Sequence, residues 1–234
     1  MRLESFLNVF AICCFRDIAD ADYVAARLAY RAKLNDQFLW SSLQTVEKYL
    51  KCILLLKRIR APKIGHDLEA AVNKVAANGI ALGLTPATTN FIEHVDTYGR
   101  FRYRETSPYW FGGQLVMLDR AAWELRRFCV VGETKQVTQL REGIPAPKVR
   151  LEGGILEKIM DDPKNPARRP LLWQNGFFGN RVRRKVVNYG TFGAVNSPLF
   201  LYPQFIEEVA EYVLLPEKIK AAYREAAKNS CEGR

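Results

Sequence analysis

Histidine is the scarcest functional residue in this chain of 234 residues, which has only His66 and His94. The five cysteines are odd in number, scattered and without a Cys-x-x-Cys pair. A structural zinc site is therefore not expected, because such sites draw their ligands from clustered cysteine and histidine. The cysteine pattern also argues against a disulfide framework and favours a reducing compartment. We expect a cytoplasmic protein that needs no metal and no cofactor.

Long apolar runs are also scarce. The run Leu7–Phe15 near the N-terminus is interrupted only by Asn8. It is too short to cross a bilayer, and no small-residue cleavage site follows it. We expect it to be a packed first helix, and we expect no membrane partner.

Positive charge is abundant but unevenly distributed, with a formal net charge of +10. Residues 1–133 carry 18 basic and 14 acidic side chains, and residues 201–234 carry 5 and 6. Residues 134–200 carry 12 basic and 5 acidic side chains, so most of the excess lies there. Such a charge can favour contact with nucleic acid or with an anionic membrane surface. Lysines and arginines that are simply solvated are the alternative.

The clearest periodic pattern begins at Asp36. Apolar residues follow at alternating spacings of four and three, which predicts one face of a long α-helix before Arg60-Ala61-Pro62: Leu39, Leu43, Val46, Leu50 and Ile53. After Lys51 the helix is apolar on every side, which indicates burial in a bundle or dimer. Weaker patterns predict further helices over residues 5–16, 20–34, 67–77, 87–98 and 114–131. The first half therefore predicts an all-α antiparallel bundle.

After Gly132 the pattern changes. Prolines and glycines break residues 134–200 into short pieces, so a largely irregular basic extension is predicted there. The apolar groups Leu171–Trp173 and Phe177–Phe178 are expected to dock on the bundle. Two closing helices are predicted near residues 203–214 and 216–228, each with a proline near its start. We expect two parts, a helical bundle over 1–133 and the basic extension over 134–234.

Two short motifs lie at the ends of the loop that follows the long helix. Glu47-Lys48-Tyr49-Leu50-Lys51 precedes the loop, Gly65-His66-Asp67-Leu68 opens the next helix, and Arg102-Tyr103 comes later. In this combination residues 18–130 resemble the HEPN family, the higher eukaryote and prokaryote nucleotide-binding domains. The resemblance implies an antiparallel helical bundle, usually a homodimer, that acts on RNA or nucleotides. Some members are ribonucleases of toxin–antitoxin or defence systems, and others are non-catalytic binding modules.

The resemblance also implies a test for catalysis. Members that cleave RNA carry an arginine followed four to six residues later by a histidine, which moves a proton while the arginine steadies phosphorane charge. No histidine follows Arg100, Arg102 or Arg104, and only Arg60 and His66 have a comparable spacing. The candidate catalytic residues are therefore His66 and Arg102, and the family's motif is absent at its expected place.

Candidate binding residues are cationic, with one aromatic ring among them. Arginine can hold a phosphate and tyrosine can stack on a base; a surface turn or a solvated edge is the alternative. The first group is Lys48, Arg100, Arg102, Tyr103 and Arg104, and the second is Arg181, Arg183, Arg184 and Lys185.

Three functions remain open from the sequence. The first is a non-catalytic RNA- or nucleotide-binding protein, in a defence or toxin–antitoxin context. The second is a metal-independent ribonuclease toxin with a departed active site. The third is a structural protein whose basic segment binds a small acidic antitoxin or a nucleotidyltransferase.

Overall fold

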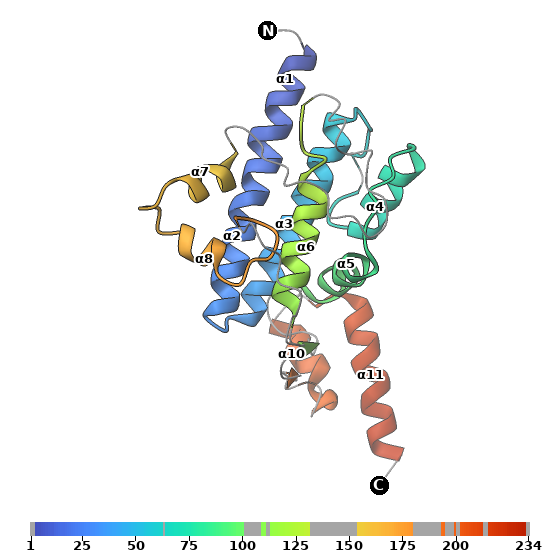
Figure 1. The fold of residues 1–234 in the computed structure, drawn as a ribbon. Helices are drawn as coiled ribbons and strands as arrows, with labels where there is room; N and C mark the ends of the chain where they lie inside the picture. Colours follow the sequence, from blue (N-terminus) through green and yellow to red (C-terminus); the bar gives the residue numbers. More distant parts are fainter. Residues whose placement is uncertain are drawn as a thin grey trace. The chain divides into compact units, whose positions relative to one another are not determined.

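The computed structural model describes residues 3–62, 64–100, 109–110, 113–131, 154–179, 193–194, 199, 202–212 and 215–232. The chain divides into two compact units (Figure 1). Unit 1 comprises residues 1–100 and 113–188, and unit 2 comprises residues 101–112 and 189–234. The regular structure is helical except for a two-residue antiparallel pairing in unit 2, between β1 (Tyr109–Trp110) and β2 (Gly193–Ala194). The predicted all-α class is confirmed, whereas the boundary at residue 133 stays a prediction.

The first helices of unit 1 follow one another without a break. They are α1 (Leu3–Phe10), the π-helical η1 (Ala11–Arg16) and α2 (Asp17–Arg31). The expectation that a new helix begins at Asp20 is wrong. Asp20 is fully buried and accepts hydrogen bonds from Tyr49 Oη and Arg126 Nε, each at 2.7 Å. Its carboxylate therefore links three helices and caps none.

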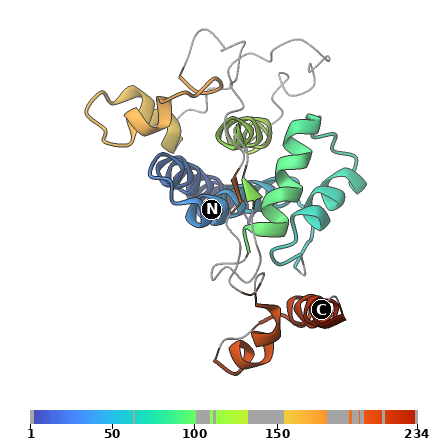
Figure 2. The same ribbon diagram turned by 90° about the horizontal axis from the view of Figure 1, so that it is seen from below.

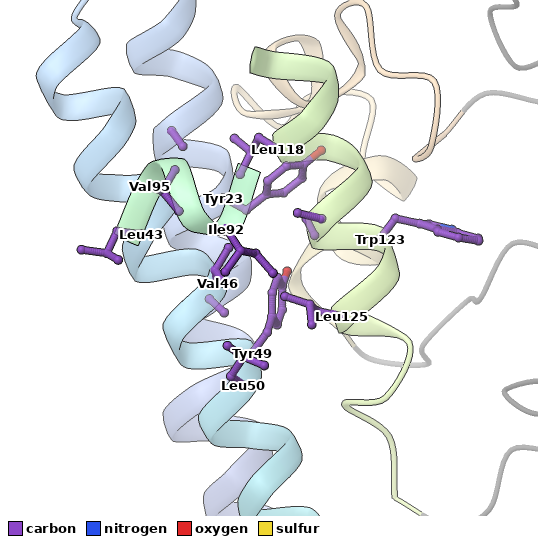
Figure 3. Packing of buried hydrophobic residues seen from close by; sticks show 14 of the residues in the cluster. Tyr23, Leu43, Val46, Tyr49, Leu50, Ile92, Val95, Leu118, Trp123 and Leu125 are labelled. Atoms are coloured by element: carbon purple, nitrogen blue, oxygen red, sulfur yellow. The ribbon is translucent and has the colours of Figure 1, made fainter. Parts of the chain in front are cut away.

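The long helix predicted from the apolar stripe is α3 (Asn35–Leu56), which packs closely along α2. All five residues of the stripe are buried, from Leu39 to Ile53. Figure 3 shows this face meeting side chains of α2, α5 and α6, with Tyr23, Tyr49 and Leu118 among the labelled residues. After Lys51 the predicted burial holds for Cys52, Ile53 and Leu54, whereas Leu55 and Leu56 are only half-buried.

Three further helices complete this core, α4 (Leu68–Ala77), α5 (Pro86–Tyr98) and α6 (Gln114–Arg126). The side chain of Asp67 caps α4 by accepting from the Ala70 amide at 2.8 Å. At the end of α5, a Cβ on Gly99 would lie 2.9 Å from the Leu39 carbonyl oxygen, so glycine permits a close crossing with α3. α6 is shorter than predicted, because its last turn tightens into the i+3 bonds of Phe128 and Cys129.

Two short helices, α7 (Ile155–Asp161) and α8 (Arg168–Leu172), pack against α2 within unit 1. Leu171 and Phe178 are buried in the same apolar core as α3. In Figure 2, α6 lies between this pair of helices and the pair formed by α4 and α5. The two flanks of unit 1 are therefore built by different segments of the chain.

Unit 2 holds η3 (Pro203–Phe205), α10 (Ile206–Tyr212) and α11 (Glu217–Glu232). These elements cover most of the residues for which the two closing helices were predicted. Its small apolar core is formed by Leu199, Ile206 and Leu215. Arg224 on α11 pairs with Glu207 and Glu217. In the part of the chain that the structure describes, no helix is long and apolar enough to cross a membrane.

Candidate nucleic-acid or nucleotide site

His66 lies in the turn that opens α4, and its position is set from both sides. Gly65 before it takes a left-handed conformation with φ of +56°, and Asp67 after it caps the helix. The imidazole Nδ1 lies 2.8 Å from Glu47 Oε2 on α3. The His66 side chain is 68% exposed, whereas that of Glu47 is only 7% exposed. A buried carboxylate therefore holds an exposed imidazole.

Glu47 is held in its charged form by two partners. Burial alone would raise the pKa of Glu47, but hydrogen bonds from Lys51 and His66 outweigh it and lower that pKa below its ordinary value. Lys51 Nζ donates to Oε1 at 2.6 Å, so each carboxylate oxygen has its own partner. Because the charged carboxylate can only accept hydrogen bonds, His66 Nδ1–H donates to it. In the neutral ring, Nε2 is then the unprotonated nitrogen, which can take up a proton.

Arg100 joins the same group from the end of α5. Its Nη2 donates to Asp96 Oδ1 and, at 3.1 Å, to the carbonyl oxygen of His66. Asp96 Oδ1 also accepts from the Leu68 amide at 3.2 Å, which ties α5 to the start of α4. We call the following residues the His66 cluster: Glu47, Lys51, His66, Asp96 and Arg100.

The His66 cluster presents an imidazole and two cations beside two carboxylates that are already paired. The side chain of Arg100 is 40% exposed and that of Lys51 is 31% exposed. Such groups can donate charge-assisted hydrogen bonds to a phosphate. The Glu47–His66 pair can also move a proton, because a carboxylate that fixes one ring nitrogen orients the other.

Among the sequence candidates, the structure brings His66 and Arg100 together and places Lys48 elsewhere. Lys48 Nζ pairs with Asp22 on α2 and donates to Gln44 Oε1 at 2.9 Å. Arg60 lies exposed in the loop after α3, and within the described residues no hydrogen bond or ion pair joins it to His66. Although Arg60 and His66 have the sequence spacing of the family's catalytic pair, no described contact joins them.

The remaining candidates stay predictions, because they lie outside the residues that the structure describes. They are Arg102, Tyr103, Arg104, Arg181, Arg183, Arg184 and Lys185.

The sequence did not single out three members of the cluster as site residues: Glu47 and Lys51, which it placed only in a motif, and Asp96, which it did not identify at all. The spacing of four residues between Asp96 and Arg100 on a helix is an ion-pair pattern that could have identified Asp96. The second histidine, His94, is buried two residues before Asp96 on α5, and its Nε2 lies 2.8 Å from the Gln114 amide nitrogen. Burial lowers the pKa of His94 to about 4, so it is neutral at physiological pH. Among the described residues, no three His, Cys, Asp or Glu side chains gather as a metal site.

Comparison with known proteins gives one result. Residues 15–115 match the family model described as the HEPN domain. No curated protein and no solved structure matches the chain. The matched region contains both motifs and the whole His66 cluster. Residues 15–115 of this chain are therefore similar to the HEPN domain, a family that suggests a function related to nucleotides or RNA.

Proposed function

We propose that this chain binds single-stranded RNA or a nucleotide through the His66 cluster, without cleaving it. The observation that carries the proposal is the contact between Arg100, just after α5, and His66, in the turn before α4; Arg100 Nη2 lies 3.1 Å from the His66 carbonyl oxygen. Both described contacts of Arg100 use Nη2. Nε and Nη1 therefore remain in place to donate to a phosphate, the ligand that the planar guanidinium suits best.

The test is fluorescence anisotropy with a labelled single-stranded oligoribonucleotide, with unlabelled mononucleotides as competitors. Arg100→Met should weaken binding about tenfold, because a charge-assisted hydrogen bond is lost. Lys74→Met, at an exposed lysine on α4, is the charge-matched control and should weaken binding less than about twofold. Equal losses in the two variants would remove the His66 cluster as the site.

A ribonuclease is the second candidate, and the Glu47–His66 pair is the observation that favours it. His66 Nε2 would take the proton of a ribose 2′-hydroxyl, whose oxygen attacks the adjacent phosphorus. The bond to the 5′ oxygen then breaks, and that oxygen takes up a proton from solvent. Arg100 would steady the charge on the phosphorane.

Cleavage of a fluorogenic RNA in the presence of a metal chelator separates the two functions. The binding function predicts no cleavage above the level of an unrelated protein purified in the same way. The ribonuclease predicts cleavage that His66→Ala abolishes, and that Glu47→Gln reduces by disturbing the ring orientation. Cleavage that survives both variants would exclude this pair as its acid or base.

The homodimer expected for the family has a candidate surface on α1. This helix has no buried residue, and Leu3, Phe6 and Phe10 follow at spacings of three and four. That spacing is typical of a seam between two helices, and the single charged residue of α1, Glu4, causes little repulsion between copies. We expect a second copy of the chain to cover it. Phe6→Lys should convert a dimer to a monomer in light scattering, and a wild-type monomer would contradict this.

A smaller acidic antitoxin or a nucleotidyltransferase remains the expected alternative partner. Co-expression with the neighbouring reading frame tests it, and co-purification of an acidic chain that displaces RNA would support this assignment.

A further inference from the structure

Two arginines of unit 1 lie over aromatic rings on the flank that α8 covers. The Arg31 guanidinium on α2 lies 5.2 Å from the centroid of the Trp173 ring. The Arg120 guanidinium on α6 lies 5.4 Å from the centroid of the Phe177 ring. Arg31 is exposed, and the other three residues are half-buried, so all four side chains contribute to the surface.

These two arginines differ from those of the core in what neutralises them. Arg27 pairs with Asp119, and Arg126 pairs with Asp20 and Glu157. In the described part of the chain, no ion pair joins Arg31 or Arg120 to a carboxylate. Among the described residues, their charge is met by the faces of the rings, which stabilise a cation weakly at exposed sites. An anion that approaches this surface therefore meets two positive charges that no described carboxylate neutralises.

The loop that carries the two rings is held in place by buried hydrogen bonds. Arg27 donates to the carbonyl oxygens of Pro170, at 3.1 Å, and of Trp173. Asn175 donates to Tyr23 Oη at 2.8 Å and accepts from the amides of Phe177 and Phe178, each at 3.0 Å. Since this loop is fixed to α2 at several points, the rings are pre-organised, which lowers the cost of binding.

We propose that Arg31, Arg120, Trp173 and Phe177, here called the aromatic platform, form a second contact surface for single-stranded RNA. A base stacks at the edge of the platform on Trp173, and the two arginines bind the flanking phosphates. Rings interleaved with cations suit unpaired nucleotides, since every base has a face that can stack. The proposal rests on the proposed RNA binding. Figures 1 and 2 show α8 on the flank of α6 opposite α4 and α5, so the loop after α8 that carries Trp173 and Phe177 is separate from the His66 cluster.

The test compares a labelled single strand of about 12 nucleotides with a duplex of the same length, bound to the full chain. Trp173→Leu keeps apolar bulk and removes the aromatic face, so it should weaken single-strand binding at least about fivefold. Trp40→Leu, at another half-buried tryptophan of unit 1, is the matched control and should bind like the wild type. Duplex binding should change less than about twofold in both variants.

A second variant keeps the test independent of folding. Arg31→Gln removes an exposed cation, should leave the melting temperature unchanged, and should lower both affinity and its dependence on salt. If both platform variants bind the single strand like the wild type, the platform is overturned while RNA binding at the His66 cluster stands. If the wild type binds no RNA, the proposed function fails, and the platform fails with it.

Discussion

Arginine–carboxylate pairs occur in two regions of unit 1 and do different work in each. In the core, Arg126 lies between Asp20 and Glu157, with four contacts of 2.7–2.8 Å and side chains at most 5% exposed. On the surface, Arg100 pairs with Asp96 through a side chain that is 40% exposed. Removing one partner from a buried pair leaves an uncompensated charge, whereas water replaces a lost partner at the surface. The first pair therefore holds helices together, and the second remains available to a ligand.

The largest loss of stability is expected when the arginine of the buried group, Arg126, is removed. Arg126→Met should lower the free energy of unfolding by about 3–5 kcal/mol, because it leaves Asp20 and Glu157 buried together. Arg100→Met, the same change on the surface, should lower it by less than about 1 kcal/mol. Chemical denaturation followed by circular dichroism measures both. Similar losses for the two variants would mean that burial does not separate these pairs.

The buried histidine gives a second large effect, in its dependence on pH. The pKa of His94 in the folded chain is about 4, against an ordinary value of 6.5, because burial disfavours the charged form. Between these values the unfolded chain binds the extra proton, so stability is lost as pH falls from 6.5 to 4, by up to about 3 kcal/mol.

His94→Gln, whose amide can still contact Gln114, should remove most of this loss of stability between pH 6.5 and 4. Denaturation at a series of pH values between 7 and 4 checks the difference between the two proteins. Parallel curves for the wild type and the variant would show that another group carries the acid sensitivity.

A smaller effect is expected at Glu47, whose buried carboxylate holds the exposed His66 ring. The pKa of Glu47 is lowered below 4.5, so its pairs stabilise the fold above that value and lose their contribution as pH falls through the lower, folded value. Glu47→Gln should be less stable than the wild type at pH 7, and the gap should close at the acid end. His66→Ala should cost less than about 1 kcal/mol at pH 7. If the difference in stability between the wild type and Glu47→Gln widens in acid, the charged form of Glu47 does not stabilise the fold.

The sequence predicted the parts of the fold that depend on local spacing. The stripe of α3 was identified because its 3–4 spacing is complete within one helix. The motif at Gly65–Leu68 located His66, and the resemblance to the HEPN family that it supported agrees with the family model that matches residues 15–115. The continuous helix through Asp20 could not be foreseen, because Asp20 is held by an arginine 106 residues later in the chain.

The same limit applies to the two candidate surfaces. Asp96 and Arg100 form a local pair, so the sequence could have indicated that contact. Trp173 over Arg31 joins residues that only the packing of α8 on α2 brings together. Side chains far apart in the sequence are assembled by tertiary packing, which periodicity within one helix does not encode.

The salt dependence of RNA binding tests the central claim most directly, since it counts the cations that contact phosphate. The logarithm of the association constant of a single-stranded oligoribonucleotide is measured against the logarithm of salt concentration for the wild type and for Arg100→Met. Loss of one phosphate contact should reduce the slope by about 0.7, with the free energy of unfolding nearly unchanged. If a folded Arg100→Met variant keeps the wild-type slope and affinity, Arg100 of the exposed Asp96–Arg100 pair does not contact the RNA, which contradicts the central claim.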